Sequence, residues 1–377
     1  MTLPVVFHVS GNRMRPLPQA GHTTAIWRQL CRVAVHYHVF ARAESPGAST
    51  SVEGNIILHL WPSYIRSEAE ALLGSLRLIP WIRKLRPSVI ICQCPVIGGL
   101  AATLGSLLFG VPLLVELHGE HFFRDRKRNA KARLFQWLAR PALRRATSVR
   151  VLAAGMRESL RLTYGDAVGR KAAVIPTRVD LGVFGPAKSD YSIAGRLRVV
   201  TVGSFIPLKN HLKLIESVAH LPDVELTIVG AGPLRASYEH KIHDMNIADR
   251  VRLLPWMKQE ELARVLAAHD VYVHPSWTEA LSRAILEAMA MGLPVVATSV
   301  GFVGDAITSG ENGVLVEPGS RSGLTAAISA LLQSASERER LGRSGHSTIV
   351  ANYEANKVFA DYRKLIVEVA QSGQSGN

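Results

Sequence analysis

The chain has 377 residues, of which 47% are hydrophobic and 20% are charged, so it is long enough for two globular domains and its composition excludes a disordered or fibrous protein. Residues 1–185 hold 25 Lys and Arg against 10 Asp and Glu, whereas residues 186–377 hold 19 against 20. The basic surplus therefore belongs to the first half, where it indicates an anionic partner such as a membrane surface, a nucleic acid or a phosphorylated substrate.

The first half shows short apolar runs separated by helix-like segments. These runs predict strands at 4–9, 34–40, 55–60, 88–93, 112–117, 147–152 and 172–176. The first run has no basic segment before it and no long apolar core, so we expect a strand there rather than a signal peptide. The repeated order of strand and helix predicts an α/β fold with a doubly wound parallel sheet.

One long apolar stretch needs a separate interpretation. Residues 87–115 contain no charged residue, which is enough to span a bilayer. Pro and Gly divide it, and we therefore expect a strand at 88–93, a helix at 97–109 and a strand at 112–117. A membrane-spanning helix is the less favoured alternative.

Cysteine usage and short motifs bear on metal binding. Cys92 and Cys94 form a C-x-C pair without a second pair, so we expect buried, reduced thiols and a cytoplasmic protein. The sequence contains neither Asp-x-Asp nor His-Glu-x-x-His, so it predicts no metal site.

Two runs combine basic and apolar residues, at 61–86 and 122–145. The second holds nine Lys and Arg against one Asp, with Phe122, Phe123 and Trp137 interleaved. Basic helices with aromatic residues are typical of anionic membrane surfaces, so we expect peripheral attachment to the inner face of the membrane. The alternative is a solvated helix whose Leu and Phe side packs on the core. Nucleic acid is less favoured, because no recognised binding motif accompanies the charge.

The second half begins after a Gly-, Ser- and Pro-rich linker at 185–196. It opens with a strand at 198–202, a loop at Gly203 and a helix at 210–219. A later loop, Gly230-Ala-Gly232-Pro233, matches only half of a G-x-G-x-x-G motif, so it is weak evidence for a dinucleotide. The chain closes with a helix predicted over 353–370.

Residues 270–298 carry the clearest pattern in the chain. They predict a strand, a loop, a helix of small residues ending near Gly292, and a second buried strand. Glu279 lies just before the helix and Glu287 about two turns into it, which predicts a separation of about 10 Å. That is the span from the ribose to the sugar of a nucleotide-sugar. The helix N-terminus would then bind the diphosphate, and the two carboxylates would accept hydrogen bonds from the ribose and sugar hydroxyls. The alternative is two solvated glutamates.

Glu279-x7-Glu287 followed by AMAMGLPVVAT resembles the signature of the family-4 retaining glycosyltransferases of GT-B fold. The family usually has Gly and Phe directly after the first Glu, where this chain has Ala280 and Leu281. The resemblance implies two Rossmann-like, doubly wound domains facing a central cleft. The first, residues 1–185 with the returning helix 353–370, is expected to bind the acceptor, and the second, residues 197–348, the nucleotide-sugar.

The resemblance also implies roles for individual residues. Glu279 and His118, which stands in the family's His-Gly position, are the expected catalytic residues. Lys209 matches a family Lys that holds the diphosphate, but Ser204 replaces the Arg that usually accompanies it. The other residues expected at the sugar donor are Gly21, Gly203, Gly230, Gly232, Ala280, Leu281, Ser282 and Glu287.

The expected reaction is transfer of a sugar, with retention of configuration, from a UDP- or GDP-linked donor to an acceptor hydroxyl of a glycan or lipid-linked glycan. The resemblance implies attack from the leaving-group side, with the departing phosphate taking the proton, and no cofactor or nucleic acid is expected. Two alternatives stay open, a nucleotide-sugar 2-epimerase of the same architecture and a lapsed enzyme that only binds the nucleotide-sugar.

Overall fold

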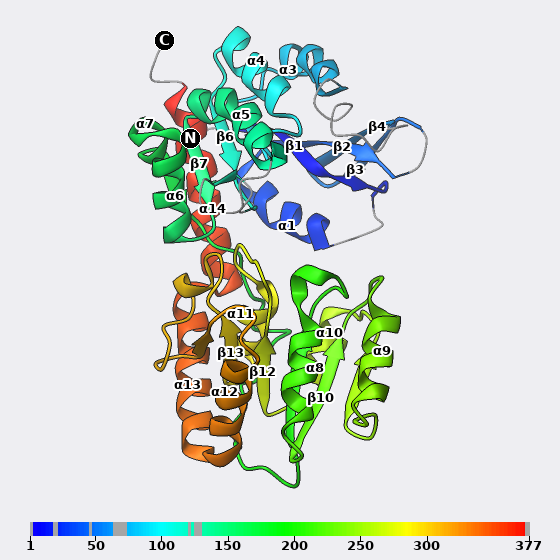
Figure 1. The fold of residues 1–377 in the computed structure, drawn as a ribbon. Helices are drawn as coiled ribbons and strands as arrows, with labels where there is room; N and C mark the ends of the chain where they lie inside the picture. The colour runs from blue at the N-terminus through cyan, green and yellow to red at the C-terminus, as the bar shows by residue number, and fades with distance from the viewer. Residues whose placement is uncertain are drawn as a thin grey trace. The chain divides into compact units, whose positions relative to one another are not determined.

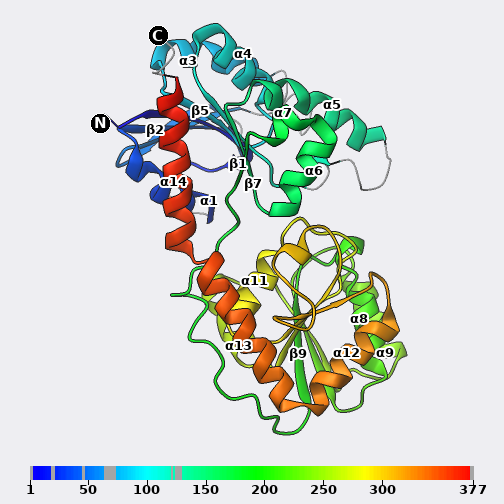
Figure 2. The same cartoon turned by 90° about the vertical axis from the view of Figure 1, so that its left-hand side faces the viewer.

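The structure is a computed structural model that describes residues 3–17, 22–44, 47–62, 74–119, 122–123 and 130–373. The chain divides into two compact units, one made of Met1–Pro176 and Phe359–Asn377 and the other of Thr177–Val358. The boundary between them falls inside the last helix, α14 (Ala355–Ser372). Figures 1 and 2 show both units as a twisted sheet with helices packed around it.

The first unit contains a sheet with the strand order β3-β4-β2-β1-β5-β6-β7-β8. Its strands are β1 Val5–Met14, β2 His36–Ala43, β3 Ser49–Glu53, β4 Ile56–Trp61, β5 Val89–Cys92, β6 Leu113–Glu116, β7 Ser148–Val151 and β8 Ala172–Val174. All neighbours pair in parallel except β3, which is antiparallel to β4. The seven predicted strands are therefore present, and β3 was missed because its sequence, STSVE, lacks the apolar run of a buried strand.

Helices cover this sheet. They are α1 His22–Leu30, α3 Ile79–Leu85, α4 Gly99–Phe109, α5 Ala130–Arg145, α6 Ala154–Tyr164, α7 Asp166–Gly169 and α14. The uncharged stretch 87–115 forms β5, α4 and β6, as predicted. Among the helices that the structure describes, none combines the length and the apolar character needed to cross a membrane.

The second unit contains a wholly parallel sheet with the order β11-β10-β9-β12-β13-β14. Its strands are β9 Leu197–Val202, β10 Val224–Val229, β11 Val251–Leu254, β12 Val271–His274, β13 Val295–Thr298 and β14 Val314–Val316. Its helices are α8 His211–Ala219, α9 Arg235–Asp244, α10 Gln259–Ala267, α11 Arg283–Ala290, α12 Arg321–Gln333 and α13 Ala335–Asn352. Buried β-branched residues in the strands and apolar helix faces explain this doubly wound arrangement.

The small residues of α11 allow it to pack deep in the second unit. Every residue from Ile285 to Ala290 is buried, and α13 packs directly against the helix. A Cβ atom on Gly342 of α13 would lie 2.2 Å from the carbonyl oxygen of Gly292, so only glycine permits this approach. The small residues that predicted this helix therefore have a structural role, because they allow α11 to pack closely in the core.

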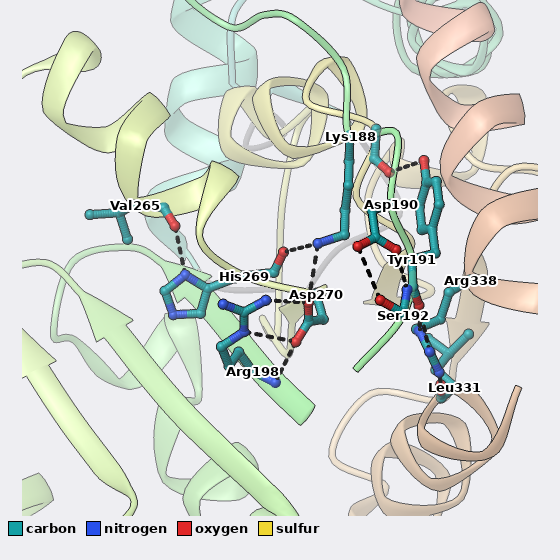
Figure 3. Close-up of polar contacts among 11 residues, drawn as sticks. Lys188, Asp190, Tyr191, Ser192, Arg198, Val265, His269, Asp270, Leu331 and Arg338 are labelled. Atoms are coloured by element: carbon teal, nitrogen blue, oxygen red, sulfur yellow. Dashed lines mark hydrogen bonds and ion pairs between the residues drawn. The ribbon is translucent and has the colours of Figure 1, made fainter. Parts of the chain in front are cut away.

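The predicted linker, 185–196, is bonded to the second unit rather than standing free (Figure 3). Lys188 donates to Asp270 at 3.1 Å, and the hydroxyl of Tyr191 donates to the carbonyl of Gly292 at 2.8 Å. Arg338 in turn donates to the carbonyl of Tyr191. Residues 177–185, expected in the first domain, also lie in the second unit, because the chain pairs with residues near 354 there.

Candidate active site

The candidate site lies at the carboxyl edge of the second sheet. Because the strands are parallel, the loops that follow β9, β10, β12 and β13 emerge at this one edge. Ligands of doubly wound sheets bind at such edges, beside helix N-termini. The loops carry most of the residues that the sequence singled out.

The glycines Gly203, Gly230 and Gly232 bring two of these loops into contact. A Cβ atom on Gly230 would lie 2.0 Å from the carbonyl oxygen of Gly203, and one on Gly232 would lie 2.6 Å from the carbonyl oxygen of Phe205. Only residues without a side chain allow this packing. Gly230 and Gly232 therefore allow the loop after β10 to pack on the loop after β9, where the side chain of Lys209 lies against Gly203.

Lys209 is positioned by the turn that precedes α8. It ends a short 3-10 helix, and Asn210 follows in the left-handed conformation with φ 53°. The Asn210 side chain donates to the carbonyl of Pro275 at 3.1 Å, and the backbone N–H of Trp277 donates to the carbonyl of Leu208 at 2.8 Å. These bonds fasten the loop after β9 to the loop after β12.

Glu279, in the loop after β12, is paired with Lys209 across these two fastened loops. Its Oε1 also accepts from His274 Nε2 at 2.7 Å and from Ser276 Oγ at 3.1 Å. Burial opposes ionisation of this carboxyl, but the His274 hydrogen bond and the Lys209 charge outweigh it and lower the pKa of Glu279 to about 2. The carboxylate is therefore charged at any physiological pH.

Glu287 lies in a different environment. It is the fifth residue of α11, one turn from the start rather than two, and is 7% exposed. Burial raises its pKa, although Arg283 and a hydrogen bond from Gln259 act in the opposite direction. Because Glu279 is in the loop and not on the helix, the rise per helical residue does not give the separation of the two carboxylates.

The segment between the two glutamates forms the N-terminus of α11. Ser282 is the N-cap, with an extended backbone, and no capping bond from its side chain is present. The Leu281 side chain is 7% exposed and belongs to the hydrophobic core, so any ligand contact there falls to backbone N–H groups. Ala280 is held through its carbonyl oxygen, which accepts from the N–H of Phe302 at 3.0 Å.

His118 belongs to the first unit, in the loop that follows β6. Its Nε2 lies 3.3 Å from Glu116 Oε2, and Glu116 also accepts from Arg150 at 2.7 Å and from the hydroxyl of Tyr362 on α14. Burial opposes ionisation of Glu116, but the charge of Arg150 outweighs it and holds the pKa well below its usual value. Gly21, the remaining predicted residue, lies outside the described residues.

Sequence reasoning missed the residues that contact the predicted site residues, namely His274 and Ser276 at Glu279, Gln259 at Glu287 and Glu116 at His118. Two of these residues could have been found from their positions in the sequence. His274 and Glu116 are polar residues at the carboxyl ends of buried strands. In the part of the chain that the structure describes, no group of three or more His, Cys, Asp or Glu could hold a metal ion.

Two family profiles match the chain. The profile described as "Glycosyl transferases group 1" matches residues 189–348, and that described as "Glycosyl transferase 4-like domain" matches residues 19–178. The chain belongs to the group 1, family-4-like glycosyltransferases. The first profile lies mostly in the second unit and the second profile mostly in the first.

Curated relatives of this chain include proteins of bacterial glycan synthesis. A lipopolysaccharide core biosynthesis glycosyltransferase of Rhizobium meliloti is 35% identical over 168 residues, which cover 45% of this chain and 49% of the relative. A UDP-Gal:alpha-D-GlcNAc-diphosphoundecaprenol alpha-1,3-galactosyltransferase of Escherichia coli is 28% identical over 58% of this chain and 60% of the relative. The chain spans about half the length of several curated relatives that it matches.

Solved structures share the GT-B fold of this chain. Sucrose-phosphate synthase from Thermosynechococcus elongatus aligns with a TM-score of 0.82 and 22% identity, covering 97% of this chain and 99% of the other. HepE of Anabaena in complex with UDP aligns with a TM-score of 0.77 and 16% identity, covering 98% of this chain and all of the other. At these identities the likeness concerns the fold.

Proposed function

We propose that this protein is a retaining glycosyltransferase that moves a sugar from a UDP- or GDP-linked donor to an acceptor hydroxyl in the synthesis of a surface polysaccharide or lipid-linked glycan. The observation that carries the proposal is the pairing of Lys209 with Glu279, 70 residues apart, at the carboxyl edge of the second sheet. A cation and a carboxylate beside a helix N-terminus suit a diphosphate and the hydroxyls of the sugar joined to it.

Each residue of the candidate site has a proposed role. The Lys209 ammonium and the N-terminus of α11 neutralise the diphosphate, and the loop at Gly203, Gly230 and Gly232 lies beneath it. Glu279 accepts hydrogen bonds from the sugar and Glu287 from the ribose. The second unit is the proposed donor-binding domain, and the first, which carries the proposed catalytic residue His118, is the proposed acceptor-binding domain.

The chemistry follows from these roles. The acceptor oxygen forms a bond to the anomeric carbon on the face from which the nucleoside diphosphate departs. The bond from that carbon to the phosphate oxygen breaks, and the leaving phosphate takes the proton of the acceptor hydroxyl. Configuration is retained, and the protein contributes position and charge stabilisation rather than a nucleophile.

The test begins with a screen of UDP- and GDP-sugars by thermal shift, since a ligand that binds only the folded protein raises its melting temperature. Each stabilising donor is then incubated with lipid-linked and soluble glycan acceptors, and the new anomeric centre is assigned by NMR. The proposal predicts a product with the configuration of the donor sugar. A donor epimerised at C2 without any acceptor would instead support the 2-epimerase alternative.

We further propose that the protein is cytoplasmic and attaches peripherally to an anionic membrane through α5. Trp137 and Leu134 on this helix are 65% and 53% exposed, whereas Ala139, Ala142 and Leu143 are buried. The exposed stripe also holds Arg133, Arg140 and Arg144, and no acidic residue occurs anywhere in the helix. A tryptophan and arginines on one exposed face suit the boundary between lipid headgroups and acyl chains.

Only part of the run 122–145 supports this membrane proposal. Phe122 and Phe123, two of the aromatic residues interleaved with the basic ones in the run 122–145, are buried, with 3% and 4% of their surface exposed. Leu134 was expected to face the core if α5 were only a solvated helix, and it is exposed instead. The proposal therefore rests on one stripe of α5 rather than on the whole run 122–145.

Flotation with anionic vesicles tests this stripe. Replacing both Leu134 and Trp137 by Ser is expected to weaken vesicle binding roughly tenfold or more, because each large apolar side chain contributes about 1.5–3 kcal/mol when it leaves water. The matched control is Leu162→Ser on α6, which is 52% exposed and lies outside the stripe. Equal binding by the double variant and the control would contradict the proposal.

A further inference from the structure

The Glu279 carboxylate accepts several hydrogen bonds from other residues of the protein. Its Oε1 accepts from Lys209, from His274 and from Ser276, all at one oxygen atom. The same structure gives its Oε2 no hydrogen bond to a described residue. The cation proposed for the diphosphate is therefore bound to the carboxylate proposed for the sugar.

Lys209 is also the one cation that the sequence supplies in the loop after β9. Residues 203–210 read GSFIPLKN, so Ser204 leaves this loop with a single positive charge. A diphosphate carries more charge than one carboxylate and offers several acceptor oxygens to an ammonium. When a diphosphate enters, Glu279 and the ligand compete for the same Lys209 protons.

His274 can hold Glu279 independently of Lys209. It ends β12, is 2% exposed, and its Nδ1 lies 3.0 Å from the hydroxyl of Tyr272. Burial lowers the pKa of His274 and raises that of Tyr272 well above its usual value, so the ring is neutral and the phenol protonated at pH 7. The phenol then donates to Nδ1, and Nε2–H is left to donate to the ionised Glu279.

Ser276 completes this support. It is fully buried, its hydroxyl donates to Glu279 Oε1 at 3.1 Å, and its carbonyl oxygen accepts from Thr298 Oγ1 at 2.6 Å. The backbone of the loop is thus fixed to β13 at the residue that contacts the carboxylate. Two neutral donors remain on Glu279 when Lys209 leaves.

We propose that Lys209 exchanges Glu279 for the diphosphate when the sugar donor binds, and that His274 is the positioning residue that keeps Glu279 in place through the exchange. The inference rests on the proposed function, because it names the partner of Lys209 before and after binding. The exchange predicts opposite effects of the Glu279 carboxylate on two properties. The carboxylate weakens diphosphate binding, but it promotes the transfer step.

Calorimetric titration of UDP and GDP into the full-length chain tests the exchange. Glu279→Gln removes the charge that competes for Lys209, so it is expected to tighten binding of the preferred nucleoside diphosphate roughly threefold to tenfold, while the transfer rate falls. Glu216→Gln is the matched control, since Glu216 pairs with Lys213 and Lys241 on the same unit and should leave affinity unchanged. Affinity that is equal or weaker in Glu279→Gln would overturn the exchange.

The positioning role of His274 has a separate readout. His274→Ala is expected to lower kcat roughly tenfold or more while the nucleoside diphosphate affinity changes less than twofold, and His274→Gln, whose amide can donate to Glu279, should restore part of kcat. A parallel loss of affinity and kcat in both variants would indicate a structural role and overturn the assignment. If His274→Ala fails to fold, His274→Gln and Tyr272→Phe test the positioning role instead. Each of these variants is expected to lower kcat below the wild-type value and to leave the affinity for the nucleoside diphosphate unchanged.

The two failures are distinguishable. Wild-type protein that binds neither UDP nor GDP and transfers no sugar contradicts the proposed function itself. Wild-type protein that binds and transfers, with no tightening in Glu279→Gln, contradicts only the exchange of Lys209.

Discussion

At the scale of single residues, the two glutamates of the motif have opposite electrostatic environments. Lys209 and His274 keep Glu279 ionised, whereas burial with weaker compensation raises the pKa of Glu287. A buried carboxylate with a raised pKa costs folding free energy at neutral pH. The charge of Glu287 is therefore unfavourable for folding at neutral pH, which is consistent with its proposed role at the ribose.

Glu287→Gln should separate these two effects. We expect the KM for the nucleotide-sugar to rise roughly tenfold or more, because an amide accepts less strongly from ribose hydroxyls than a carboxylate. We expect the melting temperature to rise at neutral pH, because the buried charge is removed. The matched control is Glu260→Gln on the exposed side of α10, which should change neither property.

The sign of the pH dependence follows from the raised pKa of Glu287. Its folded pKa lies above the unfolded value of 4.5, so the cost of its charge is complete above the folded pKa and disappears as the pH falls toward 4.5. The stabilisation by Gln should therefore be present at neutral pH and vanish in acid, as urea unfolding at several pH values can measure. A Gln variant that is less stable than wild type at pH 7 would contradict this assignment.

The sequence could predict the two glutamates but not these environments. Their spacing is local, and the family resemblance gives it a meaning. The partner of Glu279 lies 70 residues earlier in the chain, and Gln259 reaches Glu287 from another helix. Contacts of that kind depend on how α8, α10 and α11 pack, which periodicity alone does not specify.

At the scale of elements, the loop between β12 and α11 is held from two sides. Asn210 binds it from the loop after β9, and Phe302 binds it from the loop after β13. Gly301, with φ 59°, lies so close that a Cβ atom there would fall 1.4 Å from the carbonyl oxygen of Glu279. The orientation of Glu279 therefore depends on a glycine that the motif does not include.

Gly301→Ala is expected to displace the Glu279 loop. We predict a loss of about 2 kcal/mol or more in the free energy of unfolding, from the strained backbone and the contact with the Glu279 carbonyl, together with a large fall in transfer rate. Gly304→Ala is the control three residues away, because no atom lies within 4 Å of its Cβ position and its φ is not positive. Chemical denaturation and initial rates measure both, and equal behaviour of the two variants would refute the packing argument.

The elements themselves were largely predictable. Apolar runs of strand length located β1 and β9 because parallel strands are buried on both faces. The antiparallel strand β3 was missed because its exposed, polar residues carry no such signal. The linker at 185–196 was predicted from its composition, but the bond from Lys188 to Asp270 depends on a residue 82 positions away.

At the scale of the whole molecule, charge and chemistry are divided between the two halves of the chain. The first half carries the basic surplus and the exposed stripe of α5, and the nearly neutral second half carries the proposed sugar-donor site. This division predicts that changes to the stripe alter attachment to vesicles and leave affinity for the nucleotide-sugar in solution unchanged. Equilibrium titration of the Leu134 and Trp137 double variant measures the second property.

The central claim is that Lys209 binds the diphosphate of a nucleotide-sugar. Calorimetric titration of the preferred UDP- or GDP-sugar into wild type, Lys209→Ala and Lys213→Ala tests it most directly. Lys213 is the matched control, because it lies one turn further along the chain and pairs with Glu216. We predict that Lys209→Ala weakens binding roughly tenfold or more while Lys213→Ala binds as wild type does. Unchanged affinity in Lys209→Ala would contradict the account.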